Sequence, residues 1–236
     1  QEGWNYHLEQ KEGPLKYNGV VYNEMKGAFS SPDEVLEREI MNHLFPDTTY
    51  GCESGGDPKN IPDLTYENFL NFHRTYYHPS NSYIYLYGNM DMEKKLAFID
   101  EHYLSHFDYL DVDSVIQEQK AFGACQDVTL EYPVAENEGE EDNTYLSYNM
   151  VVGNAADSQM AMAFEVLDYA LLSAPGAPLK QALLDVKAGK DVYGSYDDGI
   201  LQPYFTVIAK GSNPDRKEEF VSVIRQVLGD IVKNGI

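Results

Sequence analysis

Basic residues are scarce in this sequence. It contains 17 Lys and Arg residues against 39 Asp and Glu residues, which gives a formal net charge of −22. Nucleic acid requires a basic surface for binding, so this balance argues against nucleic acid as a partner. An acidic surface keeps a protein soluble and also attracts cationic peptides. We expect most of these charges to serve solubility.

Long apolar runs and cysteines are scarce as well. No run of apolar residues is long enough to span a bilayer, and no segment has the pattern of a signal peptide. We therefore expect no membrane association. Cys52 and Cys125 are the only cysteines, and widely spaced free thiols are typical of a reducing cytosol. The expected location is cytoplasmic, and a leader on a preceding segment stays compatible with the sequence.

The histidines do not form a recognisable zinc motif. There are six of them, and none belongs to an H-x-x-E-H sequence. His102 and His106 stand four residues apart on a helix expected over 91–107, so they would share one of its faces. Such a pair can hold zinc, but a solvated pair near a helix C-terminus is favoured here. His73 and His78 flank the end of another expected helix and receive the same interpretation.

The sequence does contain a short segment, residues 19–27, that is expected to form a helix closed by glycine at both ends. Glu24 lies there among Val20, Val21 and Met25, which can turn inward. Burying an unpaired carboxylate is costly, so Glu24 needs a partner. Two interpretations remain open from these residues alone. One is a partly exposed surface side chain, favoured by composition, and the other is a metal ligand whose partners lie elsewhere.

Helices dominate the expected structure of the first half. Ser31 to Glu34 has the pattern of a capping box with proline at the first helical position, which predicts a helix through about Leu44. Thr65 is expected to cap a helix that ends at Tyr77. Alternating residues at 83–87 predict a strand. The side chains expected to face a core are Leu36, Ile40, Leu44, Phe69, Phe72, Tyr76, Leu96, Ile99 and Tyr103.

Residues 108–126 change character and are expected to form an acidic linker between two cores. The acidic run at 136–142 is expected to be a solvated hairpin tip. The order expected beyond the linker is β-β-α-α-β-β-α, which predicts helices on one face of a largely antiparallel sheet, an α+β fold. The expected strands are 128–132, 145–152, 189–196 and 204–209, and the expected helices are 155–172, 178–186 and a last one capped at 213–215. The apolar stripe of the last helix is expected to consist of Phe220, Ile224, Val227 and Ile231.

Several stretches carry a resemblance to a known family. They are QEGW at 1–4, VVYNEMKGAF at 20–29 followed by Ser-Pro-Asp, YGCESGGDPKNIP at 50–62, and FHRTYYHPSN at 72–81. In this order they resemble the insulinase/pitrilysin family of zinc metallopeptidases, and within it the presequence-protease branch. The segment PLKQALL at 178–184 is similar to part of the second homologous domain of that family.

The resemblance implies a role for Glu24. In that family two histidines of an H-x-x-E-H helix and one glutamate of the N-E-M-K-G segment hold the zinc, and the glutamate maps onto Glu24. The Glu within H-x-x-E-H is the general base that activates a zinc-bound water. The motif is absent here and the chain opens on Gln1 in mid-motif. We therefore expect an internal fragment with one of three zinc ligands, with no catalytic residue, and inactive by itself.

The resemblance also implies the architecture and the activity. The fold is expected to consist of repeated α/β rolls, with the later part of the first, zinc-bearing domain at 1–120 and the first part of the second homologous domain at 121–236. The expected parent is a zinc-dependent endopeptidase that degrades medium-length unstructured peptides, basic ones included, in a closed chamber formed with the remaining domains of the same chain. The alternative is a non-catalytic structural or regulatory member of the family, and retention of Glu24 favours the enzyme. Residues that bind substrate are not identified.

Overall fold

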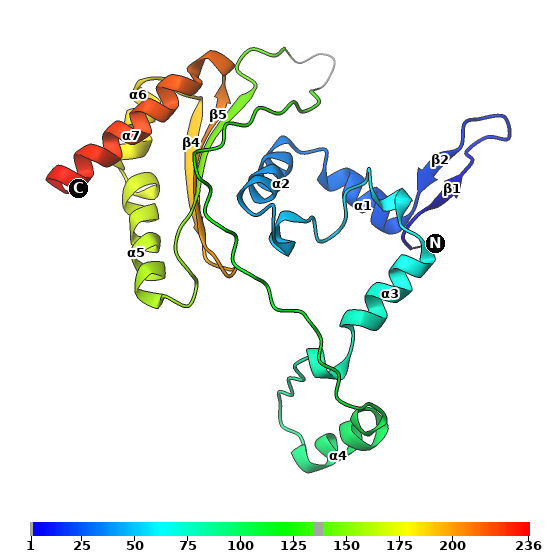
Figure 1. Cartoon of the computed structure of the whole chain (residues 1–236). Coiled ribbons are helices and arrows are strands. Elements are labelled where there is room, and N and C mark those ends of the chain that lie inside the picture. Colours follow the sequence, from blue (N-terminus) through cyan, green and yellow to red (C-terminus); the bar gives the residue numbers. More distant parts are fainter. Residues whose placement is uncertain (1, 135–138) are drawn as a thin grey trace. The chain divides into compact units, whose positions relative to one another are not determined.

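The computed structural model describes residues 2–134 and 139–236, shown in Figure 1. The chain divides into two compact units. One comprises Gln1–Glu24 with Gly56–Ile116, and the other comprises Met25–Gly55 with Gln117–Ile236. Gln1 of the QEGW segment and positions 136–138 of the expected acidic hairpin tip lie outside the described residues. The domain boundary at residue 120 stays a prediction.

The first unit begins with a hairpin that the sequence did not predict. Strands β1 (Asn5–His7) and β2 (Lys16–Asn18) are antiparallel. Strands of three residues are too short to show an alternating pattern. Ring contacts hold the hairpin instead: Trp4 meets Tyr6 and Tyr17 edge-on with centroids 5.3 Å apart, and Tyr6 stacks on Tyr17 at 5.6 Å. Such contacts stabilise beyond the area that they bury.

The helices of the first unit form where the sequence predicts them, but their apolar faces are not covered. Helices α3 (Tyr66–Tyr76) and α4 (Met92–His102) belong to this unit, and α1 (Val20–Ala28) begins in it and ends in the second. Thr65 and Asn68 form the reciprocal cap of α3, with 3.1 Å from the Asn68 amide to the Thr65 hydroxyl. The expected core positions Phe69, Phe72 and Leu96 are 67%, 60% and 56% exposed. The periodicity identifies an apolar face, and that face packs only where a partner surface is present.

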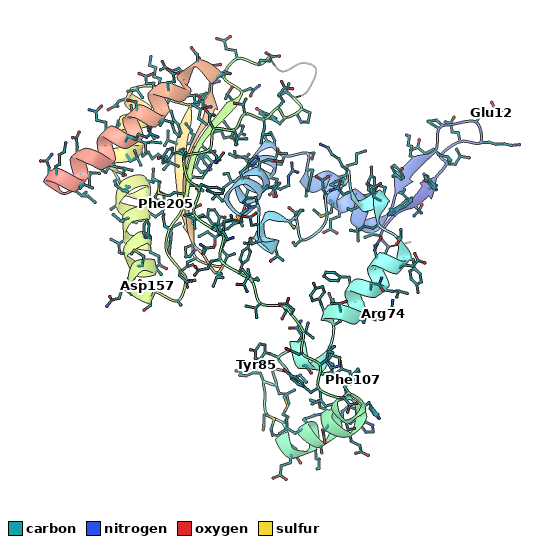
Figure 2. The ribbon with its side chains drawn as sticks, in the orientation of Figure 1. Glu12, Arg74, Tyr85, Phe107, Asp157 and Phe205 are labelled. Atoms are coloured by element: carbon teal, nitrogen blue, oxygen red, sulfur yellow. The ribbon has the colours of Figure 1, made fainter. Side chains whose placement is uncertain are left out.

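Two expected strands do not form. Residues 83–87 and 128–132 carry neither helix nor strand, and Tyr85 is 84% exposed with its side chain pointing outward (Figure 2). A segment with an alternating residue pattern forms a strand only when a neighbouring strand pairs with its backbone N–H and C=O groups. No strand within residues 2–134 and 139–236 pairs with either segment.

The second unit is built on a three-stranded antiparallel sheet in the order β3-β5-β4. The strands are β3 (Thr144–Val151), β4 (Asp191–Asp197) and β5 (Tyr204–Ser212). Val207 of the central strand lies opposite both Tyr148 and Gly194. Since side chains alternate along a strand, odd and even positions of β5 face opposite sides of the sheet.

Three helices cover one face of this sheet (Figure 1). They are α5 (Ser158–Asp168), α6 (Pro178–Asp185) and α7 (Lys217–Asn234). Phe205 and Val207 of β5 are 5% and 1% exposed beneath them, and Figure 2 shows Phe205 on the sheet. The helical side of this core consists of Leu171, Leu172, Leu179, Leu183, Phe220 and Ile224. These elements confirm the predicted α+β fold.

Helix α2 (Pro32–Leu44) covers the opposite face of the sheet. Ile40 and Phe45, 7% and 0% exposed, pack against Tyr204 and Ile208 of β5. The sequence predicted this helix and its apolar stripe, but it placed the helices on one face only. The second face is covered by a segment that precedes the central strand β5 by more than 150 residues, and sequence periodicity does not reveal such a distant contact.

The expected linker is anchored at Gln119. This side chain is 6% exposed and accepts a hydrogen bond of 2.9 Å from the Asp47 amide while donating one of 2.8 Å to the Asp47 carboxylate. The backbone amide of Gln119 donates to the side-chain oxygen of Gln202 at 2.5 Å. Residues 108–126 have no helix or strand, yet Gln119 joins the loop after α2 to the segment before β5.

The remaining sequence expectations concern the membrane and the cysteines. No described helix combines the length and the apolar character needed to cross a bilayer. Cys52 and Cys125 are both exposed and have free thiols.

Candidate functional site

The start of α1 is built against the first residues of the chain. Gly19 adopts φ +154°, and a Cβ there would lie 2.4 Å from the Gly3 carbonyl oxygen. The amides of Val21 and Tyr22 donate to the carbonyls of Glu2 and Gly3 at 2.9 and 3.1 Å. The first amides of a helix have no partner inside the helix, and here the segment that carries the QEGW motif supplies the acceptors.

Glu24 lies on the exposed side of α1. The expectation that Val20 and Val21 turn inward is wrong, because they are 59% and 36% exposed. Met25 is half-buried, and its sulfur lies beside Gly55, where a Cβ would approach it to 2.3 Å. The helix therefore presents its carboxylate outward, with no burial cost for the charge.

The described residues do not complete a metal site around Glu24. Within residues 2–134 and 139–236 no group of three or more His, Cys, Asp or Glu side chains could hold a metal ion. A glutamate oxygen is an ordinary zinc donor, and zinc sites use three or four protein ligands. The role of Glu24 as a zinc ligand therefore stays a prediction.

The alternative histidine pair does not share a helix face. Helix α4 ends at His102, and Tyr103 leaves the helical conformation with φ −138° and ψ −66°. His106 belongs to a separate short 3-10 helix, Leu104–His106. The break removes the i, i+4 geometry that the sequence suggested. His102 packs on the ring of Phe98 instead, with centroids 4.5 Å apart.

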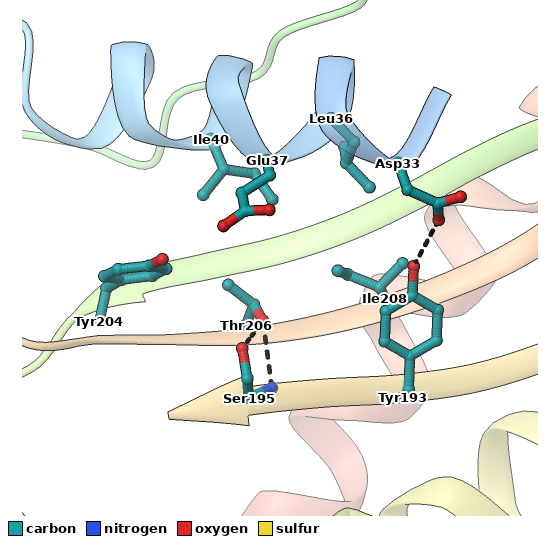
Figure 3. Close-up of a pocket in the computed structure, with 9 residues that line it drawn as sticks. All are labelled: Asp33, Leu36, Glu37, Ile40, Tyr193, Ser195, Tyr204, Thr206 and Ile208. Carbon is teal, nitrogen blue, oxygen red and sulfur yellow. Dashed lines mark hydrogen bonds between the residues drawn. The ribbon is translucent and has the colours of Figure 1, made fainter. Parts of the chain in front are cut away.

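A cavity of about 380 Å³ lies between α2 and strands β4 and β5 (Figure 3). Its apolar walls come from both the helix and the sheet, and two carboxylates of α2 point into it. The spacing of these carboxylates, one turn apart, places both on the helix face that meets the sheet. Its lining residues are Asp33, Leu36, Glu37, Ile40, Tyr193, Ser195, Tyr204, Thr206 and Ile208.

Asp33 closes one end of this cavity. Its carboxylate lies 2.8 and 3.2 Å from the ammonium of Lys210 and accepts hydrogen bonds from the hydroxyls of Tyr193 at 3.1 Å and Tyr145 at 3.5 Å. The hydrogen bond from Lys210 holds the pKa of Asp33 below its usual range, and the same contact raises the pKa of Lys210. Burial, followed by the Asp33 charge, raises the pKa of Tyr193 to about 12.

Glu37 stands at the other end of the cavity without a partner. No ion pair or hydrogen bond to its carboxylate occurs among the described residues, and Figure 3 shows it above Tyr204 and Thr206. Burial raises the pKa of Glu37, and the charges of Glu34, Asp197 and Glu53 raise it further. The Thr206 hydroxyl below it accepts a 3.2 Å hydrogen bond from the Ser195 amide.

The sequence reasoning missed this cavity. Leu36 and Ile40 were predicted as part of an apolar stripe with Leu44, and Asp33 and Glu37 lie on the same side of the helix. What it could not show is that the facing surface is a sheet formed by residues 191–212.

The fold is that of M16-like peptidases. A putative M16-like peptidase from Alicyclobacillus acidocaldarius superposes with a TM-score of 0.55 at 18% identity, covering 92% of this chain and 50% of that one. A peptidase M16 inactive domain from Pseudomonas fluorescens superposes with a TM-score of 0.58 at 18% identity, covering 92% of this chain and 51% of that one. Residues 63–236 match the family described as Peptidase M16 inactive domain. The chain belongs to this peptidase family.

Curated relatives extend the match over the whole chain. Protein HypA of Clostridium perfringens (strain 13 / Type A) is 52% identical over 236 residues, which are 100% of this chain and 24% of that protein. Presequence protease 1, chloroplastic/mitochondrial, of Arabidopsis thaliana is 36% identical over 239 residues, which are 100% of this chain and 22% of that protein. The chain thus spans about a quarter of the length of these relatives. The resemblance to the presequence-protease branch is confirmed.

Proposed function

We propose that this chain is part of a zinc-dependent endopeptidase that degrades medium-length unstructured peptides in a closed chamber. Glu24 is one of its three protein zinc ligands. The observation that carries this proposal is the N-E-M-K-G helix, which presents an exposed carboxylate on a helix whose first amides are bound by the carbonyls of Glu2 and Gly3. Membership of a peptidase family with presequence proteases among its relatives supports it.

The role of the chain's own residues in this proposal is to fix one ligand. Gly19 lets the backbone turn against Gly3 and begin α1, and the bonded amides of Val21 and Tyr22 hold the first turn in place. A ligand on a rigid helix keeps its geometry better than one on a loop. Zinc, when bound, supplies an acidified water for peptide hydrolysis. The general base and two ligands come from an H-x-x-E-H motif that this sequence does not contain.

The charge of the chain fits peptide substrates. With a net charge of −22, it adds an acidic surface that attracts basic peptides by long-range electrostatics. The chamber would be completed by the remaining domains of a longer chain, as the length of the relatives suggests. The cytoplasmic location stays a prediction, and the Arabidopsis relative carries the words chloroplastic/mitochondrial in its name.

The test is a Glu24→Gln variant of the full-length protein. The amide keeps the shape of the side chain but is a poorer zinc donor than a carboxylate. Changes to residues that merely orient zinc ligands cost 10- to 100-fold, so we expect zinc affinity and peptide turnover to fall by more than about tenfold. Metal is measured by elemental analysis, turnover with a fluorogenic peptide, and folding by circular dichroism.

Glu34→Gln is the matched control, because Glu34 is an exposed glutamate on the neighbouring helix and makes the same change of charge. It should retain full zinc and activity. Full zinc occupancy with unchanged turnover in Glu24→Gln would remove Glu24 from the metal site.

The second candidate is a non-catalytic structural or regulatory subunit. The description of the matched family as an inactive domain favours it for residues 63–236. The two candidates differ in the full-length protein. An enzyme contains about one equivalent of zinc and cleaves peptides, whereas a subunit without the metal motif does neither.

A further inference from the structure

The first unit has almost no hydrophobic core of its own. Both hydrophobic clusters found among the described residues lie in the second unit. In the described part of the first unit, Ile61 is the one apolar side chain that is buried, at 5% exposed. Folding must bury apolar surface to offset the conformational entropy that the chain loses. A unit with so little burial therefore depends on another stretch of polypeptide for its stability.

Helix α3 carries an exposed aromatic face. Phe69, Phe72 and Tyr76 follow one another at spacings of three and four residues, so they share one side of the helix. They are 67%, 60% and 38% exposed, and the rings of Phe72 and Tyr76 lie in contact with centroids 4.9 Å apart. Aromatic side chains that gather on one face of a helix indicate a surface that packs against protein.

The segment at 83–87 has the side chains of a strand that is covered on both faces. Tyr83, Tyr85 and Tyr87 are each at least 84% exposed and would share one face of a strand, with Ile84 and Leu86 on the other. Two apolar faces are typical of strands that are buried on both sides. The backbone of 83–87 makes no hydrogen bond to any described residue. Water can satisfy that backbone, but contact with water is unfavourable for the aromatic and aliphatic side chains.

The length of the relatives indicates which polypeptide covers these surfaces. Residues 1–236 correspond to about a quarter of Protein HypA and of presequence protease 1. Gln1–Glu24 belong to the first unit, whereas the C-terminal residues belong to the second unit, which has its own core. Residues that precede position 1 in a full-length protein would therefore enter the first unit directly.

We propose that the part of the full-length chain that precedes residue 1 supplies a strand that pairs with 83–87, together with apolar side chains that cover Phe69 and Phe72. Pairing gives the backbone of 83–87 its hydrogen-bond partners and makes this segment one strand of a larger sheet. The covering segment is apolar, because it meets aromatic and aliphatic side chains. The proposal does not depend on the assignment of Glu24 as a zinc ligand.

Photo-crosslinking of the full-length protein tests the proposal. The photoreactive residue p-benzoylphenylalanine replaces Tyr85 in one variant, Phe72 in a second and Glu67 in a control. Glu67 is an exposed residue of α3 on the side of the helix opposite to Phe72. Mass spectrometry of the digested products identifies the partner segment. The first two variants should crosslink within one chain to residues that precede position 1, and the control should not.

Hydrogen exchange of the full-length protein without substitutions is a second measurement. The amides of 83–87 should exchange at least about 100-fold more slowly than those of an unstructured peptide, because paired strand amides are protected. Exchange at the rate of an unstructured peptide would overturn the proposal. It is also overturned if either test variant crosslinks between two copies of the chain, to residues after 236, or to no other segment. Neither measurement involves zinc, so the result is separate from that for Glu24.

Discussion

The carboxylate of Asp33 lies 2.8 Å from the ammonium of Lys210. Asp33 is in the first turn of α2 and Lys210 is on β5, so the contact joins two elements that are 177 residues apart in the sequence. Tyr193 of β4 and Tyr145 of β3 donate to the same carboxylate. One side chain thus ties α2 to all three strands.

Asp33→Asn should lower the free energy of unfolding of the second unit by no more than about 1 kcal/mol. Both partners are nearly half exposed, at 47% and 44%, and solvent screens such pairs strongly. Urea denaturation followed by fluorescence measures the effect. Lys210→Met and the Asp33→Asn/Lys210→Met double variant complete a double-mutant cycle. The interaction energy between the two side chains that this cycle measures should fall at high salt.

The pH dependence of this contact has a defined sign. The pKa of Asp33 is lowered from its ordinary value of 3.8, so its stabilising effect is present above that value and is lost as the pH falls through the lower folded pKa. The pKa of Lys210 is raised from 10.5, so its effect is present below that value and is lost as the pH rises through the higher folded pKa. The free energy of unfolding of the wild type should exceed that of Asp33→Asn between about pH 4 and 10. A difference that does not shrink as the pH falls below 3.8 would contradict this.

Gln119→Ala should destabilise the second unit by about 1–3 kcal/mol. The change removes a buried side chain that makes two hydrogen bonds to Asp47, and breaking a buried hydrogen-bond network lowers stability. Gln117→Ala is the matched control, since Gln117 is exposed two residues earlier and should change stability by less than about 0.5 kcal/mol. Equal effects of the two substitutions on the free energy of unfolding, measured by chemical denaturation, would show that the hydrogen bonds of Gln119 do not stabilise the second unit.

Two Gly→Ala substitutions should change the stability of the fold in opposite directions. A Cβ at Gly194 would lie 2.1 Å from the Thr206 carbonyl oxygen and 2.5 Å from the Leu172 side chain, so Gly194→Ala should cost about 3 kcal/mol or more. A Cβ at Gly229, inside α7, meets nothing within 4 Å. Gly229→Ala should stabilise by about 0.5–1 kcal/mol, because glycine is a poor helix former. Thermal melts should show a lower melting temperature for Gly194→Ala and a higher one for Gly229→Ala than for the wild type.

The chain of residues 1–236 by itself should show no peptidase activity. It has no H-x-x-E-H motif, and no described cluster of side chains completes a metal site. Incubation with fluorogenic peptides and added zinc should give the same rate as buffer. Turnover that survives Glu24→Gln would reveal a catalytic site elsewhere in the chain.

Local signals in the sequence predicted the elements that depend on local physics. The predicted cap at Thr65 fixes the start of α3, since its side chain accepts from the Asn68 amide. The capping box expected at Ser31 does not form, because the Ser31 side chain makes no hydrogen bond to the start of α2. The apolar stripe of α7 correctly identified Phe220 and Ile224 as core residues. Capping and periodicity act within a few residues, so they are readable before the fold is known.

The wrong or missing predictions concern features that depend on contacts between segments far apart in the sequence. Residues 83–87 alternate like a strand, but no described strand pairs with them. The face of α2 that lines the cavity was visible as a stripe, while its partner sheet was not. Glu24 could be singled out only by family resemblance, because an exposed glutamate on a short helix has no distinguishing periodicity or charge pattern.

Anomalous diffraction at the zinc edge from crystals of the full-length protein would show directly whether Glu24 binds zinc. We expect a zinc ion with a carboxylate oxygen of Glu24 about 2.0–2.2 Å away, the usual distance for this ligand, together with two histidines of an H-x-x-E-H motif. A zinc ion with a complete set of ligands that leaves out Glu24 would contradict it.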